Sequence, residues 1–387
     1  MDHSLFSENS PGALTKVTIP GHGDDWAFIP EPLPDHLKPS DDVWTLLVKA
    51  HRELARLDGI GRHMQNYDLL LQPLQRREAI RSSSLEGTYA TPKQLLLYQM
   101  DPKEPKSTTD PVNAWKEVNN YGEALELGLQ LLEELPVSLR FIREIHKRLL
   151  DGVRGHQRDP GNFRRTQVWI GDYRFIPPPP LNIPECLDKF EKHINRISDI
   201  DPLIFCVLVH YQFETIHPFL DGNGRVGRLL LALMIYKWCH LNKPWLYLSA
   251  YFDKHKDEYI DSLFDISSKG DWEKWVLFCL KGTVDQAQDT VKRCDRLLAL
   301  KNEYQQAIVD GGGTSLRFHS TLENLFRFPI VSVPDLKQFH GTTYPTAKSD
   351  IDLLVKVGIL EELEEARHPK AYYCPKIISL AYDDEYQ

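Results

Sequence analysis

Residues 217–228 read HPFLDGNGRVGR, and this short stretch decides how the rest of the chain is interpreted. One long apolar run, DPLIFCVLVHYQFETI, precedes it, and a second, GRLLLALMIYKWCHL, begins at its last two residues; the two runs predict two helices. Glycines at 222, 224 and 227 let backbone N–H groups at such a junction point inward, and a helix that begins near Gly224 adds its own free N–H groups. The junction is therefore suited to bind an anion.

The charged side chains of this stretch favour a polyphosphate. Arg225 and Arg228 are three residues apart, so both lie on one face of the first helical turn, where the positive end of the helix disfavours cations. A bound polyanion explains their presence. Asp221 supplies a hard oxygen ligand for Mg²⁺, which prefers one or two carboxylates plus phosphate oxygens. His217, at the end of the preceding helix, is the natural general base.

These twelve residues match the Fic motif H-x-F-x-D/E-G-N-G-R-x-x-R at every defined position, and the predicted helices from about 113 to 275 resemble the helical core of that family. The resemblance implies transfer of AMP from ATP to a Ser, Thr or Tyr hydroxyl of a target protein or of the chain itself, with release of pyrophosphate. His217 would deprotonate the hydroxyl, and Asp221 would hold Mg²⁺. Phe219 would anchor the loop. The phosphates would be bound by Gly222, Asn223, Gly224, Arg225 and Arg228.

A β-prone segment interrupts the helices before this motif. In TQVWIGDYRFIPPPP, Gly171-Asp172 suits a two-residue hairpin turn. Because an isolated hairpin is only marginally stable in water, this one is expected to pack on the helices or to have a function. It resembles the Fic flap, which aligns an extended piece of the target by strand addition. The residues predicted to bind the target are Val168, Trp169, Ile170, Tyr173, Arg174, Phe175 and Ile176.

A second pattern lies in RSSSLEGT, where Ser82, Glu86 and Gly87 have the spacing S/T-x-x-x-E-G. Beside a complete Fic motif it resembles the inhibitory helix of the family, here expected at about 74–87. Glu86 would pair with Arg228 and take the guanidinium from the γ-phosphate, because a bidentate arginine–carboxylate pair competes with a phosphate oxygen. In some relatives the same glutamate supports removal of AMP, and the sequence leaves that activity open.

The remaining sequence predicts a mainly α-helical protein with three parts. Residues 1–105 form an N-terminal region, in which the first 40 residues are expected as extended coil, Ser40 caps a helix, and later helices begin near Pro73 and at Thr91-Pro92. Residues 106–300 form the Fic-type domain. A DGGGT joint near 310 then leads to residues 318–387, whose helix, turn, helix and hairpin predict a winged helix-turn-helix.

The C-terminal module offers a competing function, a DNA-binding regulator. TTYPTAKSDIDLLVKVGIL resembles a recognition helix, with Thr343, Tyr344, Thr346 and Lys348 toward its start. Residues 318–387 hold seven Lys and Arg and eleven Asp and Glu, so the module lacks the clustered cations that tight DNA binding needs. Protein contact or dimerisation competes equally with DNA. A γ-phosphoryl transferase resembling the Doc group is disfavoured, because that motif departs at the glycines that are intact here as Gly222 and Gly224.

Composition limits the class of protein. The 387 residues carry a net charge of −9, which opposes nonspecific nucleic-acid binding by the whole surface. The six cysteines form no C-x-x-C pair, and this favours reduced thiols over a structural zinc site. No apolar run reaches the length of a membrane span, and the N-terminus lacks a signal core, so we expect a cytoplasmic protein without membrane contact. A homodimer is a further expectation from the resemblance.

Overall fold

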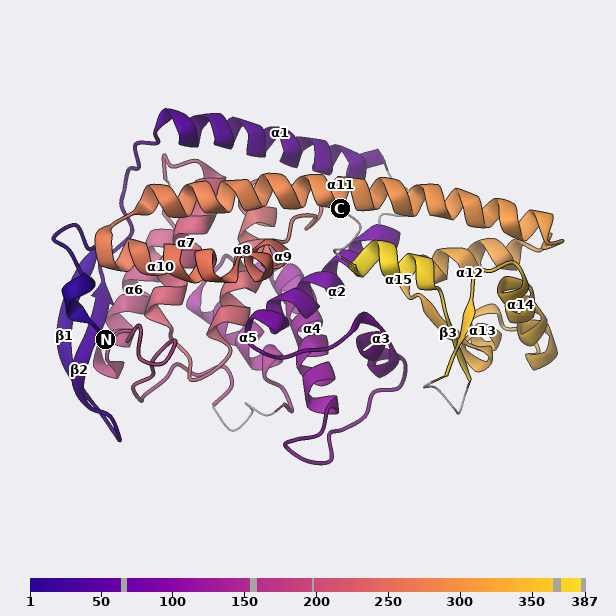
Figure 1. The fold of residues 1–387 in the computed structure, drawn as a ribbon, viewed down its shortest axis with the longest axis horizontal. Helices are drawn as coiled ribbons and strands as arrows, with labels where there is room; N and C mark the ends of the chain where they lie inside the picture. The colour runs from indigo at the N-terminus through magenta and orange to yellow at the C-terminus, as the bar shows by residue number, and fades with distance from the viewer. Residues whose placement is uncertain (64–67, 154–158, 197, 365–369, 384–387) are drawn as a thin grey trace.

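Two consecutive helices, α7 (Pro202–Ile216) and α8 (Asn223–Trp238), run through the centre of the helical block (Figure 1). Every residue of α7 from Leu203 to Ile216 except Glu214 is buried, as expected for a helix that is apolar on all sides. The computed structural model describes residues 1–63, 68–153, 159–196, 198–364 and 370–383. The neighbouring elements of the block are α3 (Pro92–Met100), α4 (Val112–Glu134), α5 (Leu139–Leu149), α6 (Ile183–Ile194), α9 (Ser249–Lys254), α10 (Lys256–Lys269) and the 3₁₀ turns His3–Leu5 and Pro180–Asn182.

The first 40 residues contain a regular element, so the prediction of extended coil is wrong for this segment. Strands β1 (Gly12–Ile19) and β2 (Gly23–Pro30) form an antiparallel hairpin in which Gly12 pairs with Pro30 and Ile19 with Gly23. The prolines of this region lie outside β1 and at the very end of β2, where a missing N–H leaves the ladder intact. They delimit two eight-residue strands instead of preventing them.

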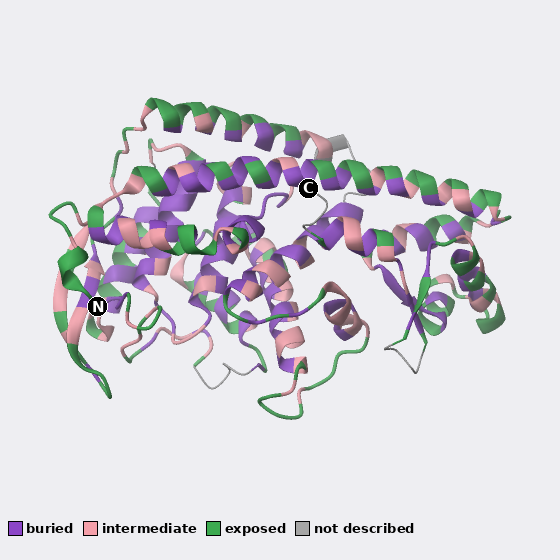
Figure 2. Ribbon diagram, viewed as in Figure 1, coloured by how far each residue is buried: buried purple, intermediate pink, exposed green. Residues whose placement is uncertain are grey.

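Helices α1 (Asp41–His63) and α11 (Trp272–Asp310) lie side by side along one edge of the molecule (Figure 1). Ser40 caps α1 as predicted, because its Oγ accepts from the N–H of Val43 at 3.3 Å. The buried face of each helix turns toward the other and toward the block, while the outer face is exposed (Figure 2). Since α11 continues unbroken to Asp310, the predicted domain boundary at 300 falls inside a helix.

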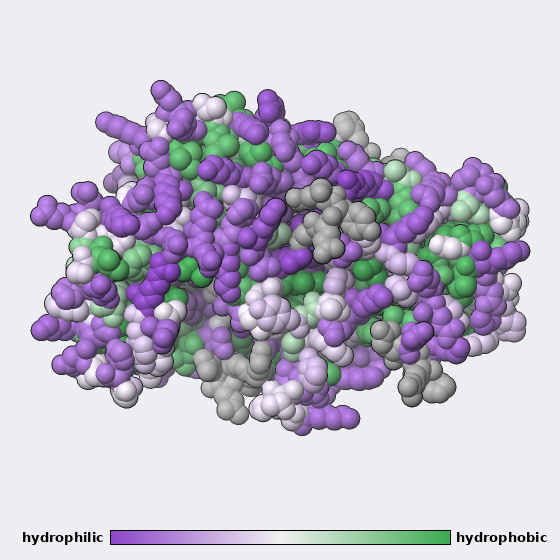
Figure 3. All heavy atoms as spheres, in the orientation of Figure 1, coloured by the Kyte–Doolittle hydropathy of each residue, from purple (hydrophilic) through white to green (hydrophobic). Residues whose placement is uncertain are grey.

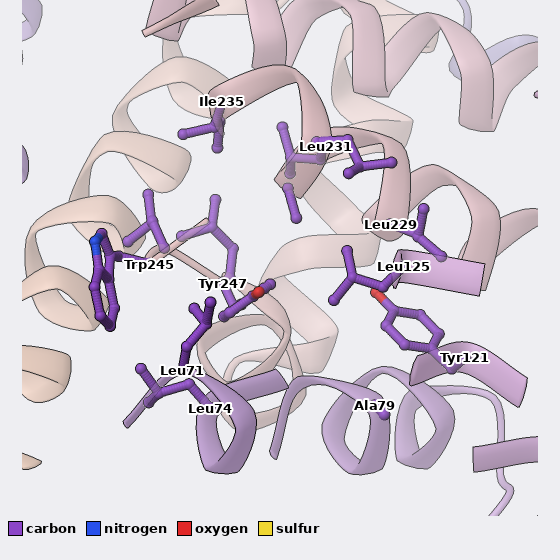
Figure 4. Close-up of a cluster of buried hydrophobic side chains, with 14 of the residues drawn as sticks. Leu71, Leu74, Ala79, Tyr121, Leu125, Leu229, Leu231, Ile235, Trp245 and Tyr247 are labelled. Atoms are coloured by element: carbon purple, nitrogen blue, oxygen red, sulfur yellow. The ribbon is translucent and has the colours of Figure 1, made fainter. Parts of the chain in front are cut away.

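Helix α2 (Asp68–Leu85) carries the predicted inhibitory segment and is built into the core. It begins earlier than predicted, because Pro73 lies inside the helix and not at its start. Its apolar side chains pack between α4 and α8 (Figure 4). The side chains labelled there on these helices are Leu71, Leu74, Ala79, Tyr121, Leu125, Leu229, Leu231 and Ile235. The position of α2 is therefore fixed by the same core that fixes α8.

The C-terminal module contains a three-stranded antiparallel sheet in the order β3-β5-β4. The helix, turn, helix and hairpin follow one another as predicted. The structure adds a strand at Ile330–Ser332 and a helix at Pro375–Tyr382, which the sequence analysis did not predict. The predicted polar turn at 365–369 lies outside the described residues. Residues of this module pack on α2 and α3 through a small apolar cluster that includes Ile80 of α2. The elements are α12 (Leu316–Arg327), β3 (Ile330–Ser332), α13 (Val333–His340), α14 (Tyr344–Lys356), β4 (Glu361–Leu363), β5 (Ala371–Tyr373) and α15 (Pro375–Tyr382).

Hydrophilic side chains cover most of the face seen in Figure 3, as the charge of the sequence leads one to expect. Within the described ranges, no helix combines the length and apolarity that crossing a bilayer requires. All six cysteines are free thiols.

Candidate active site

The junction between α7 and α8 has the geometry that its glycine and histidine suggest. His217 ends α7 in the left-handed region, with φ of 50°, and its N–H donates to the carbonyl of Phe213 at 3.0 Å. Gly222 caps the start of α8 with φ of 77°, a conformation that glycine adopts without strain. The first N–H groups of α8 are left without helical partners at this point, as at any helix start. The structure thus places His217 one short loop before the N-terminus of α8.

The loop between the two helices is held from inside. Phe219 is fully buried, which confirms its prediction as an anchor. The side chain of Asn223 accepts from the N–H of Phe219 at 2.8 Å and donates to its carbonyl at 2.9 Å. Both polar ends of this amide are therefore used within the loop. The structure therefore shows Asn223 holding the loop together, whereas the sequence predicted that its side chain contacts the phosphates.

Two residues that the sequence analysis missed brace the same loop. His146 stacks on Phe219 with ring centroids 3.6 Å apart. Its Nδ1 accepts from the N–H of Gly161 at 2.8 Å, so Nε2 carries the proton and donates to the carbonyl of Asp221 at 3.0 Å. Burial lowers the pKa of His146 to about 4, which keeps this neutral tautomer at neutral pH. His146 therefore fixes the main chain of Asp221.

Arg164 is the second brace, and it joins the loop to the flap. This buried guanidinium donates to the carbonyls of His217 (2.8 Å), Thr166 (3.1 Å) and Pro178 (2.6 Å). The last two carbonyls flank the segment 168–176 on either side, so one side chain ties both ends of the flap to the histidine. No local sequence pattern singles out Arg164, because its acceptors are backbone atoms far along the chain.

The imidazole of His217 is neutral in this setting. Burial, with help from the positive charge of Arg164, lowers the pKa of His217 to about 4. Its Nδ1 lies 3.3 Å from the carbonyl oxygen of Glu214, an acceptor, so the proton resides on Nδ1. Nε2 then has a free lone pair. A neutral imidazole that lines a cavity can take a proton from a hydroxyl group placed there.

The turn that ends α2 determines where Glu86 lies. The N–H of Gly87 donates to the carbonyl of Ser84 (2.9 Å), and the N–H of Thr88 donates to that of Ser83 (3.0 Å). This pair of bonds is a Schellman motif, and Gly87 takes the left-handed conformation that it requires, with φ of 78°. Glu86 is thereby held at the helix end, facing the junction.

Arg228 and Glu86 form the predicted ion pair, but through one hydrogen bond, Nη2 to Oε1, and not in the predicted bidentate arrangement. The buried guanidinium donates to Oε1 of Glu86 at 2.7 Å, to Oγ of Ser82 at 2.9 Å and to the carbonyl of Ser82 at 2.8 Å. Burial works to raise the pKa of Glu86, but the charge and hydrogen bond of Arg228 outweigh it, so this pKa is lowered. A Cβ added at Gly224 would lie 2.2 Å from Oε1 of Glu86. A carboxylate thus occupies the glycine-lined helix start where the sequence predicts an anion.

The second arginine of the motif has a different partner. Nη1 of Arg225 donates to Oε2 of Glu117 on α4 at 3.1 Å, and Nη2 lies 3.7 Å from Oδ1 of Asp221. Asp221 keeps 35% of its side chain exposed. A partly exposed carboxylate fits Mg²⁺, whose remaining ligands are commonly phosphate oxygens and water. Among the described residues no group of three or more His, Cys, Asp or Glu side chains is arranged to hold a metal ion on its own.

A cavity of about 200 Å³ opens beside these groups. Glu86, His217 and Arg228 line one side of it, and α10, which the sequence analysis left without a role, lines another. The residues that α10 contributes are Lys256, Tyr259, Ile260, Leu263, Phe264 and Ser267. Glu214 also faces the cavity, and burial raises its pKa to about 8, although Arg228 opposes this shift. The cavity therefore combines a charged end with an apolar wall.

The flap is smaller than the predicted hairpin. Ile170 and Phe175 exchange both backbone hydrogen bonds, at 2.8 and 3.2 Å, and form one isolated bridge. The turn holds four residues, 171–174, so the prediction of a two-residue Gly171-Asp172 turn is wrong. Positive φ continues through Asp172 and Tyr173, and these residues extend the loop. Ile170, Gly171, Arg174 and Phe175 line the cavity, which brings the flap next to His217.

The N-terminal hairpin supports the flap from outside. The N–H of Phe28 in β2 donates to the carbonyl of Ile176 at 2.9 Å, and Ile176 is fully buried. The ring of Tyr173 stacks between those of His22 (3.8 Å) and Trp169 (4.6 Å). Trp169 remains 44% exposed and Val168 half-buried, so this side of the flap faces solvent.

Arg174 attaches the tip of the flap to α10. Its Nη2 donates to Oδ1 of Asp261 at 2.5 Å, and its guanidinium lies 4.9 Å from the ring centre of Phe264. These contacts leave Arg174 partly exposed. The seven predicted flap residues therefore divide into a buried pair, Phe175 and Ile176, and a more exposed group that includes Trp169 and Arg174.

Comparisons with known proteins agree with this geometry. Residues 44–130 match the family described as Fic/DOC family N-terminal, and residues 136–235 match the Fic/DOC family. Proteins named Protein adenylyltransferase Fic from Drosophila grimshawi and Drosophila melanogaster are both 34% identical over 132 residues, or 31% of this chain. The aligned region covers 26% and 25% of those proteins, so this chain matches about a quarter of their length.

Two solved structures have a similar fold. A Fic family protein from Desulfovibrio desulfuricans G20 has a TM-score of 0.56 and 21% identity, with 88% of this chain and 98% of that chain covered. Fic-1 (residues 134–508) from C. elegans has a TM-score of 0.54 and 23% identity, with 66% and 74% covered.

Proposed function

Because residues 44–130 and 136–235 of this chain belong to the Fic/DOC family, we propose that the chain is a protein adenylyltransferase that transfers AMP from ATP to a hydroxyl of a target protein or of itself. The observation that carries this proposal is a neutral histidine, His217, facing the same cavity as the buried guanidinium of Arg228 at the glycine-lined start of α8. This arrangement offers a base and an anion site side by side, as nucleotidyl transfer requires.

The reaction follows from these positions. Nε2 of His217 takes the proton of the target hydroxyl as its oxygen attacks the α-phosphorus of ATP. The bond from the α-phosphorus to the α–β bridging oxygen breaks, and pyrophosphate leaves. The N–H of Gly224 in the first turn of α8, and the guanidinium donors of Arg225 and Arg228, are proposed to bind the β- and γ-phosphates, while the N–H of Gly222 donates to Oδ1 of Asp221 at 2.7 Å and so orients that carboxylate. Asp221 would hold Mg²⁺, which supplies charge neutralisation at the phosphates when bound.

The same geometry supports autoinhibition. Glu86 uses a donor of Arg228 and places its own carboxylate against Gly224, where a phosphate would lie. ATP and Glu86 then compete for one anion site. Ser82 holds Arg228 in its present orientation, and Gly87 provides the turn that aims Glu86. We assign these three residues to a brake on AMP transfer.

The exposed side of the flap is the proposed docking edge for a target segment, since an extended chain can add to a strand through main-chain hydrogen bonds. The C-terminal module is proposed to be a winged helix-turn-helix that contacts a protein or DNA, or contributes to a homodimer. The net charge of its residues favours protein over DNA. The proposed site of action is the cytoplasm.

The proposal is tested with ATP labelled at either the α- or the γ-phosphate. The Glu86→Gly variant, Mg²⁺ and a cell lysate should give protein labelled from the α-position and none from the γ-position. His217→Ala in the Glu86→Gly background should abolish labelling. His240→Ala is a matched control, because His240 is also a histidine with left-handed backbone but is exposed at the far end of α8. Transfer of γ-label would replace the proposal with a phosphotransferase, and equal labelling by the His217 variant would refute the role of the base.

A further inference from the structure

A buried carboxylate outside the motif holds one of its arginines. Glu117 on α4 is 3% exposed, and its Oε2 accepts from Nη1 of Arg225 at 3.1 Å. The same oxygen accepts from the hydroxyl of Thr88 at 2.9 Å. Thr88 follows Glu86 by two residues and is itself buried. Glu117 therefore touches both the arginine of the motif and the segment that ends the inhibitory helix.

Because Glu117 and Arg225 are both buried, the guanidinium of Arg225 depends on the carboxylate of Glu117 for charge neutralisation. Arg225 is 5% exposed, and a guanidinium removed from water to that extent needs a buried counter-charge. Asp221 is also near, at 3.7 Å, but it is the proposed Mg²⁺ ligand. When the carboxylate of Asp221 serves the metal, Glu117 remains to balance and orient Arg225. A guanidinium that is held at one nitrogen by a carboxylate presents its other donors in a fixed direction.

Arg225 follows Gly224, which lines the cavity, and one donor of its guanidinium lacks an acceptor in the part of the chain that the structure describes. Its Nε is buried and has no hydrogen-bond partner among the described residues. A buried guanidinium N–H without an acceptor is costly, and a phosphate oxygen would satisfy it. The ion pair with Glu117 leaves this donor available, because it uses Nη1 only.

We propose that Glu117 is a positioning residue for nucleotide binding: it orients Arg225 toward the phosphates of ATP. This inference rests on the proposed function for the identity of the ligand. Thr88, just after α2, donates to the same carboxylate. The segment that follows α2 therefore contacts both arginines of the motif: Glu86 binds Arg228 directly, and Thr88 contacts Arg225 through Glu117.

The test measures binding of ATP with Mg²⁺ by calorimetry, and AMP transfer, in the full chain carrying Glu86→Gly. Adding Glu117→Gln keeps the size of the side chain and removes its charge. The Kd and KM for ATP should rise by roughly 10- to 100-fold, the effect of one charged hydrogen bond. Glu117→Asp retains the charge and should recover part of that loss. Thermal unfolding checks that each variant is folded.

Glu123→Gln is the matched control, since Glu123 lies on the same helix and pairs with an arginine, Arg148, away from the cavity. It should leave the affinity for ATP unchanged. In a double-mutant cycle, Glu117→Gln should add no further loss once Arg225→Gln is present.

An unchanged Kd in the folded Glu117→Gln variant, or additive losses with Arg225→Gln, would overturn the inference. If ATP binds in a Glu117-dependent way but no AMP is transferred, the proposed function fails and the positioning role stands.

Discussion

Replacing Glu86 tests the proposed brake most directly, and the structure sets the size of the effect. Among the hydrogen bonds of Arg228 to described residues, the one to Glu86 has a charged acceptor, while those to Oγ and the carbonyl of Ser82 have neutral acceptors. Glu86→Gly therefore leaves the guanidinium in place and removes its counter-charge. Glu86→Gln keeps the shape of the side chain and removes only the charge.

A hydrogen bond between charged groups contributes about 1.5–3 kcal/mol when buried. The side chain of Glu86 is 39% exposed, so solvent screening reduces this contribution to about 1–2 kcal/mol. If Glu86 and ATP compete for Arg228, its removal should raise the apparent affinity for ATP by roughly 5- to 30-fold. Glu86→Gly should exceed Glu86→Gln, because only the glycine variant also clears the space beside Gly224.

The assay is the initial rate of AMP transfer from α-labelled ATP over a range of ATP concentrations. Glu123→Gln is again the control, because Glu123 is also 39% exposed and also pairs with an arginine, but far from the cavity. An equal rate for Glu86→Gly and the unchanged chain, at low as well as high ATP, would refute the competition between carboxylate and phosphate.

Three further outcomes follow, two from titratable groups of the site and one from the contact between α2 and the C-terminal module. Because burial holds the pKa of His217 at about 4, the rate of AMP transfer should fall only as the pH approaches 4, and a midpoint near 6.5 in the pH–rate profile would contradict this. Burial raises the pKa of Glu214 from 4.5 to about 8, so the folded state keeps this carboxyl protonated, and the protein loses stability as the pH rises from 4.5 to 8. Glu214→Gln removes this loss, so it should raise the Tm at pH 8 but not at pH 4.5 in thermal melts. Arg76 of α2 donates to the carbonyl of Arg327 at 2.6 Å and lies 5.2 Å from the ring of Phe328, so Arg76→Ala should loosen α2 and raise basal transfer by about two- to fivefold. The same change in the Glu86→Gly background should have no effect on the labelling assay, and a further rise there would rule out action through the brake.

The sequence predicted the parts of the fold and site that depend on local pattern. The helices around the motif, the cap at Ser40 and the left-handed glycine at 87 each follow from a residue and its neighbours. The pairing of Glu86 with Arg228 was predicted from a family resemblance and is present at 2.7 Å. The resemblance could place these two side chains together because each belongs to a motif with fixed spacing.

The missed features depend on contacts between distant segments. The N-terminal hairpin is not evident from the sequence because prolines are typical of coil, whereas here they lie outside the strands or at the end of β2. His146, Arg164 and Glu117 each contact a residue of the stretch 217–228 that is 53 or more residues away in the chain, so nothing beside them in the sequence marks them. The flap turn was misjudged because Asp172 and Tyr173 also adopt positive φ, which side chains other than glycine rarely do.

The length of α11 limits how this protein can be divided. At about 1.5 Å per residue, its 39 residues extend for nearly 60 Å, so that the first half lies along the helical block and the second half continues beyond it along the C-terminal module (Figure 1). Leu297, Leu300, Tyr304 and Ile308 are buried along its second half. A shortened chain that stops at 300 would lose part of this apolar row and bare the rest to water, inviting aggregation. A fragment intended for separate expression should therefore contain the whole of α11, together with the elements that pack on both halves of it.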